Sequence, residues 1–383
     1  MSLHLRRRRC AGDISGAFAD GAILFPLLVA LAWQTGASAA VMLATTTAVA
    51  YLVTGWLFRL PIPVQPLKSL AITAIAVGAS LAEIRVAGAV LGAIFLLILL
   101  ADVNRLARMV PAVIVHGIQL GLGVILLLKA LELLGLDPLL LAAVSAAVLG
   151  ILGLTQVTGR PVLGGVAVVS LLWGFWEAAP AAAATTSVEL RPWVLVALVV
   201  PQIALTLTNS VLGTQRTAQA YFGEDARRVT PRRLLGSIGC ANLLVAGVGG
   251  MPYCHGSGGV TAHVHGGSRS EWSNYLIGSA LLVLALSLHF GGGALPAYPA
   301  AVQATLLAVV GLFHLRLATP SWRRDETRPV LLVMAGTALL TQDMLAILAT
   351  GCLLLTVRHF WPRLTEPLWR RRAFGPRTHE PSP

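Results

Sequence analysis

Charged side chains are what this sequence has least of. Asp, Glu, Lys and Arg make up 11% of the 383 residues, whereas hydrophobic residues make up 56%. A soluble domain carries about 25% charged residues. A soluble protein of this length would therefore carry many more charged residues than this chain does. The surface must therefore face something other than water. The composition predicts an all-α integral membrane protein whose outer surface lies in a lipid bilayer.

Cysteine and clusters of metal-ligating residues are also scarce. The four cysteines show no Cys-x-x-Cys spacing, which argues against a disulfide framework and against a zinc ribbon. His255, His263 and His265 lie close in sequence, but no acidic or cysteine partner has a matching spacing, so neither a metal site nor a cofactor is predicted. The net charge of +12 comes from arginines scattered between apolar runs, which favours a role in membrane topology over nucleic-acid binding.

Apolar runs follow one another along the chain. A spanning helix needs about 20 mostly apolar residues. We find fourteen candidate segments, several of them too short to span alone, and only a few residues separate the last two. They cover residues 16–34, 38–58, 66–81, 85–102, 110–131, 138–155, 161–178, 192–213, 232–249, 257–267, 273–290, 295–316, 328–341 and 343–361.

The placement of basic residues tests this segment count. With a cytoplasmic N-terminus, the outer loops hold only Arg85, Lys129 and Arg191. Such a bias is what the positive-inside rule predicts for an even number of spans, so we expect both termini in the cytoplasm and the chain in a cell inner membrane. The predicted inner loops hold Arg59, Arg105, Arg108, Arg160, Arg216, Arg227, Arg228, Arg232, Arg233, Arg269, Arg316, Arg323, Arg324 and Arg328.

A predicted outer loop at residues 179–190 divides the chain into two halves of seven segments. We expect a first repeat over residues 1–178, a second over 191–361, and a short basic cytoplasmic tail over 362–383, with no soluble regulatory domain. The basic run at residues 6–9 resembles the start of a signal peptide. No cleavage site ends a short apolar region, so we interpret it as a cytoplasmic anchor.

The third segment of each half is interrupted. Residues 60–69 (LPIPVQPLKS) contain three prolines within six residues, and residues 247–259 (GVGGMPYCHGSGG) are rich in glycine. Proline lacks an N–H and restrains the residue before it, so the prolines cannot sit inside a helix. Paired interruptions at corresponding positions predict a transporter site where half-helices 3 and 10 meet near the midplane. The two segments run in opposite directions, which predicts inverted repeats. The alternative is a pair of unrelated proline kinks.

The interruptions carry positive charge. Each restarted helix presents unpaired N–H groups and roughly half a positive charge at its N-terminus. Lys68 adds a full charge from within a span, where ionisable groups mark function. The total of about +2 matches a divalent oxyanion such as molybdate or sulfate. The alternative for Lys68 is a side chain that extends to the membrane interface.

Polar residues in and near the interruptions complete the predicted site. Ser257 and Gln65 can donate hydrogen bonds to an oxyanion, His255 can bond substrate or a proton, and the glycines permit close backbone approach. In segment 8, polar residues recur at helical spacing and form one stripe, with helix–helix contact as the alternative role. The predicted substrate-binding residues are Gln65, Lys68, Ser69, Gln202, Thr206, Asn209, His255, Gly256, Ser257 and Gly258.

Uptake of a dianion needs a source of energy. Moving an anion into a negative-inside cell costs about 2.3 kcal/mol per charge per 100 mV. Co-transported cations are therefore required, and protons are the economical choice. Asp20, near the start of segment 1, is the predicted proton-coupling carboxylate. The alternative for Asp20 is an interfacial acid near the cytoplasmic face.

Four motifs resemble the molybdate transporter family, which is related to the sulfate permeases. They are the runs Asp20–Val29, Pro63–Lys68, Pro201–Val211 and Gly250–Gly259, and the resemblance covers Gly12 to about Arg269. It implies the seven-plus-seven inverted-repeat fold, with a core domain of segments 1–4 and 8–11 and a gate domain of segments 5–7 and 12–14. It also implies molybdate uptake, and we expect import by alternating access. Relatives of this type often dimerise through the gate domain, so a homodimer is a further expectation.

Other functions remain open at this stage. A sulfate transporter would look the same, because pocket radius is not readable from sequence. A nucleobase permease is disfavoured, because those proteins are expected to present a carboxylate from segments 8 and 10, and this chain has none there. An anion channel would share the fold. An intramembrane hydrolase using Ser257 is disfavoured, because no Gly-x-Ser-x-Gly motif in a strand–helix context supports it, so we expect a transporter and not an enzyme.

Overall fold

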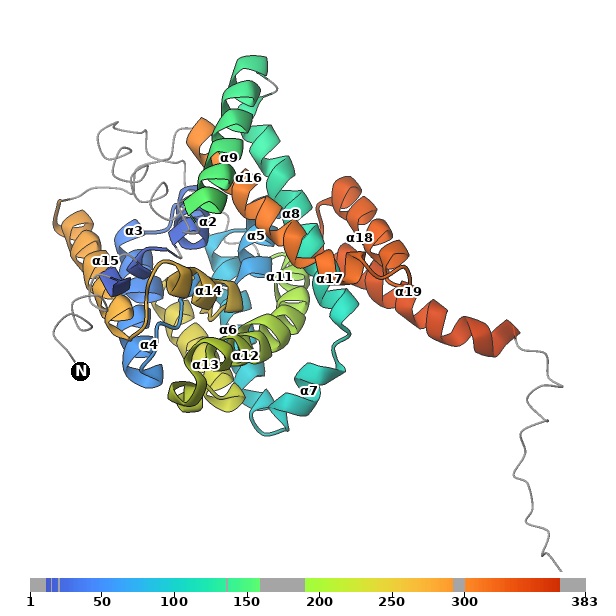
Figure 1. Cartoon of the computed structure of the whole chain (residues 1–383), viewed down its shortest axis with the longest axis horizontal. Helices are drawn as coiled ribbons and strands as arrows, with labels where there is room; N and C mark the ends of the chain where they lie inside the picture. The colour runs from blue at the N-terminus through green and yellow to red at the C-terminus, as the bar shows by residue number, and fades with distance from the viewer. Residues whose placement is uncertain are drawn as a thin grey trace, which may run out of the picture.

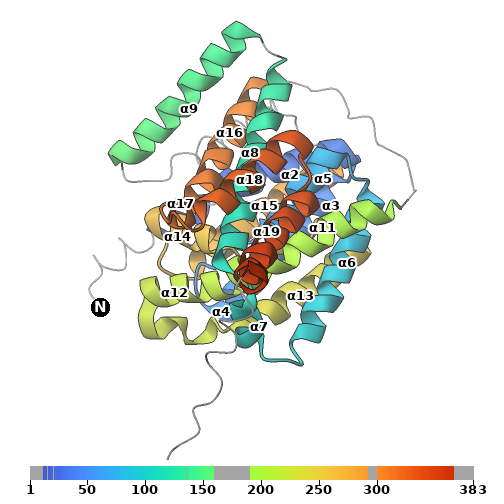
Figure 2. The same cartoon turned by 90° about the vertical axis from the view of Figure 1, so that its right-hand side faces the viewer.

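The computed structural model describes residues 12–14, 16–19, 21–135, 137–158, 190–291 and 300–365. These ranges are almost entirely helical, as the composition predicts, and they contain one pair of two-residue strands. Asp20, the predicted segment 161–178 and the chain beyond residue 365 lie outside the described residues. Figures 1 and 2 show the arrangement of the helices.

Each of the two interruptions separates a pair of helices in the described chain, α4 from α5 and α13 from α14. The first half comprises α2 (Gly21–Thr35), α3 (Ala39–Met42), η1 (Leu43–Val49), α4 (Ala50–Phe58), β1 (Gln65–Pro66), α5 (Lys68–Val77), α6 (Leu81–Ile98), α7 (Val103–Met109), α8 (Ala112–Leu134) and α9 (Pro138–Thr158). The second half comprises α11 (Pro192–Leu205), η2 (Thr206–Gly213), α12 (Thr214–Phe222), η3 (Gly223–Arg228), α13 (Pro231–Val248), β2 (Tyr253–Cys254), α14 (Ser257–His265), α15 (Trp272–Gly291), α16 (Ala300–Leu317), α17 (Thr319–Trp322), α18 (Arg328–Thr341) and α19 (Met344–Thr365).

Within the described residues, seven helical stretches are long and apolar enough to cross a bilayer. Three shorter apolar helices lie at Lys68–Val77, Arg328–Thr341 and Met344–Arg358. The first of these is the predicted broken third segment. The seven long stretches are Ala40–Phe58, Leu81–Ile98, Ala112–Leu134, Pro138–Val157, Pro192–Arg228, Trp272–Phe290 and Ala300–Leu317.

Glycines allow close contacts between helices. A Cβ added to Gly123 of α8 would lie 2.8 Å from the carbonyl oxygen of Gly311 in α16, and one added to Gly92 of α6 would lie 2.9 Å from that of Gly239 in α13. Small residues allow helix backbones to approach closely where no hydrophobic effect drives association in lipid. The pairs α8/α16 and α6/α13 are therefore fixed by backbone shape, and both views show α8 and α16 side by side (Figures 1 and 2).

The interruptions fall close to their predicted places, and beside the second one the helices end and begin within one residue of the predicted segments 232–249 and 257–267. Helix α13 continues through residue 247 and ends at Gly249, whose left-handed backbone (φ 82°) suits glycine. Helix α14 already begins at Ser257 with Gly256 as its N-cap. Residues 257–259, which the sequence assigned both to the interruption and to the segment 257–267, are therefore the first turn of a half-helix. Of these residues, Gly259 leaves room for Pro63 and Gln65, which would lie 2.6 and 2.7 Å from a Cβ at this position.

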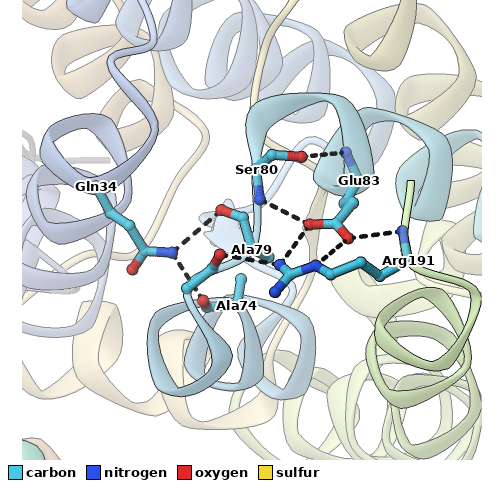
Figure 3. Close-up of polar contacts among 7 residues, drawn as sticks. Gln34, Ala74, Ala79, Ser80, Glu83 and Arg191 are labelled. Atoms are coloured by element: carbon cyan, nitrogen blue, oxygen red, sulfur yellow. Dashed lines mark hydrogen bonds and ion pairs between the residues drawn. The ribbon is translucent and has the colours of Figure 1, made fainter. Parts of the chain in front are cut away.

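The far end of half-helix α5 is held by an ion pair between α6 and the chain that enters α11. The Arg191 guanidinium donates two hydrogen bonds of 2.8 Å to the carboxylate of Glu83, which is fully buried, and the Arg191 backbone N–H donates a third at 3.0 Å (Figure 3). Glu83 also completes a capping box with Ser80 at the start of α6. One carboxylate thus joins a helix start to a segment more than 100 residues away in sequence.

The same cluster satisfies the carbonyl groups where α5 ends. Gln34 of α2 donates to the carbonyl oxygens of Ala74 and Ala79 at 2.8 and 3.2 Å, and Arg191 donates to that of Gly78 at 3.0 Å (Figure 3). The last carbonyls of a helix lack partners within the helix, and an unpaired buried carbonyl is costly. These side chains therefore anchor α5 at the end opposite to the predicted site.

Candidate functional site

The two interruptions meet in space through their backbones. Strand β1 pairs with β2 in antiparallel orientation, with Gln65 opposite Cys254. The Leu67 N–H donates to the carbonyl oxygen of Pro252 at 3.0 Å. Because β1 leads into α5 and β2 leads into α14, this pairing brings the first turns of both half-helices to one place, as the sequence predicts.

Lys68 brings its charge to the start of the opposite half-helix. Its side chain is buried, and Nζ lies 3.3 Å from the position that a Cβ would take on Gly256, the N-cap of α14. That position also lies 2.4 Å from Oε1 of Gln65, so any larger residue at 256 would displace the Gln65 amide. An ammonium group beside a helix N-terminus adds a full positive charge to the partial positive charge of the helix end. An anion is the partner that would compensate both.

The amide groups of the first turns are only partly committed. The Leu70 N–H of α5 donates to the side-chain oxygen of Gln202 at 3.1 Å. In α14, the amides of Gly259 and Val260 donate to the Gly256 carbonyl. The N–H groups of Ser257 and Gly258 lie before the first hydrogen bond within the helix, so they have no partner in the helix itself. A Cβ on Gly258 would enter open space, so this turn is accessible. The first two amides of α14 therefore precede the helix's own hydrogen bonds, and their contact with substrate stays a prediction.

The predicted polar stripe of segment 8 braces both half-helices. Gln202 accepts from Leu70 and donates to the Thr206 hydroxyl at 2.9 Å, and both side chains are fully buried. Asn209 accepts a 2.8 Å hydrogen bond from the Ser257 hydroxyl at the start of α14. The π-helical turn η2 carries Thr206 and Asn209, and such turns occur at functional sites. The stripe therefore makes the helix–helix contacts that were the alternative prediction, and its contact with substrate stays a prediction.

His255 occupies the interruption with both ring nitrogens bonded. Nδ1 lies 2.9 Å from the Pro63 carbonyl oxygen and Nε2 lies 2.8 Å from the Ser237 hydroxyl. A carbonyl only accepts, so Nδ1 carries a proton and donates to Pro63. The ring also makes an edge contact with Phe58 at a centroid distance of 5.4 Å. His255 thus ties the two interruptions together, and the proposed contact with substrate stays a prediction.

Sequence reasoning missed several residues that satisfy the unwound backbone. The Asn242 amide exchanges two hydrogen bonds with the backbone of Tyr253, at 2.8 and 3.1 Å. Asn274 donates to the Ile62 carbonyl at 2.8 Å. Buried backbone groups outside helices need such partners. An asparagine inside each of the apolar runs 232–249 and 273–290 was the sequence signal that could have pointed to them.

Two further titratable residues bear on the prediction, one beside Lys68 and one beyond the far end of α14. His314 of α16 is buried, lies close enough to Lys68 for electrostatic interaction, and bonds the Val310 carbonyl through Nδ1 at 2.9 Å. Asp13 is the carboxylate that the structure describes nearest in sequence to Asp20. It accepts from the backbone N–H groups of Arg269 and Ser270, so it joins the chain start to the end of α14.

Comparison with known proteins assigns the chain to a protein family. A family model described as the molybdate transporter of the MFS superfamily matches residues 12–126 and 194–313, which is more than half of the chain. The chain belongs to the molybdate transporter family. The motif-based resemblance is thereby confirmed, and the match extends further into the second half than the motifs indicated. Members of this family are transporters, and the chain is a multi-pass membrane protein.

Two curated plant relatives extend over most of the chain. Molybdate transporter 2 of Arabidopsis thaliana is 25% identical over 89% of this chain and 85% of the relative. Molybdate transporter 1 of the same species is 26% identical over 78% of each chain. The similarity to molybdate transporter proteins therefore includes both interruptions.

Solved structures share the fold. The transmembrane domain of a cyanobacterial bicarbonate transporter, BicA, superposes with a TM-score of 0.60 at 16% identity, covering 89% of this chain and 97% of that one. The murine Solute Carrier 26 family member A9 anion transporter, in its inward-facing state, superposes with a TM-score of 0.63 at 14% identity, covering 91% and 68%. The molybdate transporter family member described here thus has the fold of these anion transporters.

Replacing Gly259 by alanine is expected to separate the two interruptions. A Cβ there would lie 2.6 Å from Cβ of Pro63 and 2.7 Å from Nε2 of Gln65. Overpacking of this kind costs about 1–3 kcal/mol, so the apparent unfolding temperature in detergent should fall. Gly247→Ala is the matched control, because its Cβ would enter open space on α13. Equal unfolding temperatures for the two variants would contradict this packing.

Proposed function

We propose that this protein is a secondary active transporter that imports molybdate by alternating access, coupled to protons. The observation that supports it is the buried Lys68 ammonium placed at the N-terminus of α14. Two helix N-termini contribute roughly half a charge each, and Lys68 contributes one, so the site offers about +2 to a divalent tetrahedral oxyanion. Sulfate is the alternative substrate, because it has the same charge and shape.

The proposal includes fourteen segments in two inverted repeats, over residues 1–178 and 191–361, followed by a tail over 362–383. Antiparallel pairing of β1 with β2 supports it, because inverted repeats run their third segments in opposite directions. Helix packing supports it too. Helix α6 contacts α13 through Gly239, and α15 contacts η1 and α4 through Gly278. The repeats would exchange segment 4 (α6) with segment 11 (α15), and segment 9 (α13) with segment 2 (η1 and α4). The contact of α6 with α13 would therefore correspond to the contact of α15 with η1 and α4.

The same exchange relates α8 to α16, the fifth segment of each repeat. Their glycine contact would lie on the pseudo-twofold axis of a gate domain, and α5, α14 and the helices around them would form the core domain. Alternating access would then move one domain against the other around the fixed site. Dimerisation through the gate domain, an inner-membrane location and cytoplasmic termini belong to this proposal as well.

Proton coupling follows from the cost of concentrating a dianion. Entry against a negative-inside potential of 100 mV costs about 2.3 kcal/mol per charge. Asp20 is the proposed proton carrier. Asp13, its neighbour in sequence, already accepts hydrogen bonds from the backbone N–H groups of Arg269 and Ser270 and from the Ser270 hydroxyl, so it is committed to structure.

Thermal unfolding of the purified protein across a panel of anions tests the substrate. Molybdate should raise the unfolding temperature, since a ligand at 100 times its Kd stabilises the folded state by about 2.7 kcal/mol. Tungstate, sulfate and selenate in parallel rank the oxyanions. Stabilisation by uracil and by no oxyanion would contradict the proposal.

Uptake into proteoliposomes separates transport from channel conduction. We expect saturable molybdate uptake that increases with an inward proton gradient and disappears when a protonophore collapses the gradient. Flux that neither saturates nor responds to the gradient would favour an anion channel with the same fold.

A further inference from the structure

A cleft lined by arginine lies outside the substrate site. It has a volume of about 780 Å³ and opens at the end of the molecule where α4 finishes and α13 begins. In Figure 1 these helices lie at the lower edge together with α12. Its lining residues are Trp56, Leu57, Arg59, Arg227, Arg228, Thr230 and Arg233. None of them contributes a side-chain bond to the half-helix starts, so this cleft is a second candidate site.

The positive charge in the cleft is largely uncompensated. Arg59 lies 3.6 Å from the carboxylate of Glu271. Arg227, Arg228 and Arg233 are exposed and form no ion pair within the described part of the chain. Guanidinium groups bind phosphate oxygens in bidentate fashion. The cleft therefore suits a phosphate-bearing anion.

Arg59 is held in an unusual backbone conformation. It caps α4 with φ 57°, in the left-handed region that glycine adopts more easily. Its N–H still closes the helix by donating to the Gly55 carbonyl at 3.0 Å. A residue with a long cationic side chain thus occupies a position where local geometry favours glycine.

Apolar stripes lead into the cleft from the membrane-spanning helices. Val49, Val53 and Trp56 are exposed at spacings of four and three residues, which places them on one face of η1 and α4. On α13, Leu244 and Val248 are exposed on the face that also carries Arg233. Tryptophan is enriched at membrane–water interfaces. The cleft therefore stands where lipid-facing surfaces end and polar surface begins.

We propose that this cleft binds the phosphodiester headgroup of an anionic phospholipid, whose acyl chains lie along the exposed faces of α4 and α13. Basic pockets between membrane helices recognise such headgroups. A free phosphate ion has the same chemistry for the arginines, but it would leave the two apolar stripes without a role. The headgroup with its chains uses both features.

The test titrates phosphatidylglycerol into delipidated protein in a neutral detergent and follows the unfolding temperature. Wild-type protein should be stabilised by phosphatidylglycerol and not by phosphatidylcholine. The variant Arg227→Gln/Arg228→Gln/Arg233→Gln should lose on the order of 100-fold in apparent affinity, since each arginine near an anionic surface contributes roughly fivefold. Arg105→Gln/Arg108→Gln/Arg316→Gln removes the same charge from exposed positions outside the cleft and should bind as wild type.

Two other outcomes would contradict the proposal. An equal loss in both triple variants would mean general attraction between a basic protein and an anionic micelle. Stabilisation by inorganic phosphate equal to that by phosphatidylglycerol would assign the cleft to a soluble anion. If the glutamine variant unfolds without lipid, the lysine variant Arg227→Lys/Arg228→Lys/Arg233→Lys replaces it. This variant keeps the charge and loses the bidentate geometry, so wild-type affinity in it would overturn recognition of the phosphate by guanidinium forks.

Discussion

Lys68→Met is expected to weaken molybdate binding by at least about 30-fold, because removing one partner of a buried charge pair costs roughly 2–5 kcal/mol. The methionine fills the volume of the lysine stem and removes the ammonium beside the start of α14. The two helix N-termini remain, so binding should be weakened but not lost. Calorimetric titration of the detergent-solubilised protein measures the change.

Lys129→Met provides the matched control for Lys68→Met. Lys129 is the other lysine of this chain, and it pairs with Glu132 at 2.6 Å near the end of α8. The control should bind molybdate as the unmodified protein does. Wild-type affinity in Lys68→Met, with both variants monodisperse, would remove Lys68 from the site. It would leave the family assignment intact, because that rests on the sequence match over residues 12–126 and 194–313.

Arg191→Met is expected to destabilise the fold by about 3 kcal/mol. It leaves the fully buried Glu83 carboxylate without its guanidinium partner and the Gly78 carbonyl without a donor. The anchored end of α5 would then loosen. The free energy of unfolding, measured by denaturant titration in mixed micelles, reports this directly.

A double-mutant cycle distinguishes the ion pair from lost packing. Adding Glu83→Gln to Arg191→Met removes the uncompensated charge, so the double variant should recover part of the lost stability. Lys129→Met again serves as the control, because an exposed pair contributes about 0–1 kcal/mol. If Arg191→Met is no less stable than Lys129→Met, the ion pair of Figure 3 does not hold α5 in place.

The three basic residues predicted on the outer side show what sequence reasoning could not supply. Arg85, Lys129 and Arg191 were exceptions to the charge bias. In the structure, Arg85 donates to the Ala246 carbonyl at 2.7 Å, Lys129 pairs with Glu132, and Arg191 pairs with Glu83. Each of these three basic side chains therefore has a partner close to it in space. Two of the partners lie more than 100 residues away in sequence.

The polar stripe of segment 8 also shows which contacts the sequence can predict and which it cannot. Helical spacing correctly placed Gln202 and Thr206 where they can contact each other, at 2.9 Å. Spacing could not identify Leu70 as the partner of the Gln202 oxygen, because that contact joins residues 132 apart in sequence. A periodic pattern defines the face of a helix, but the neighbour on that face depends on how the helices pack.

The sequence by itself determined the membrane environment, the two interruptions, the charge of Lys68 and the family resemblance. These features depend on composition and on short stretches of sequence. A chain with so few charged residues cannot present a surface to water, and proline ends a helix because its own backbone lacks an N–H. Only the tertiary structure decided that the Lys68 ammonium lies at the start of α14, that Gln202 caps α5, and that scattered arginines converge on one cleft. The reason is that partners far apart in sequence are selected by strand pairing and glycine-mediated helix contacts, which no local pattern encodes.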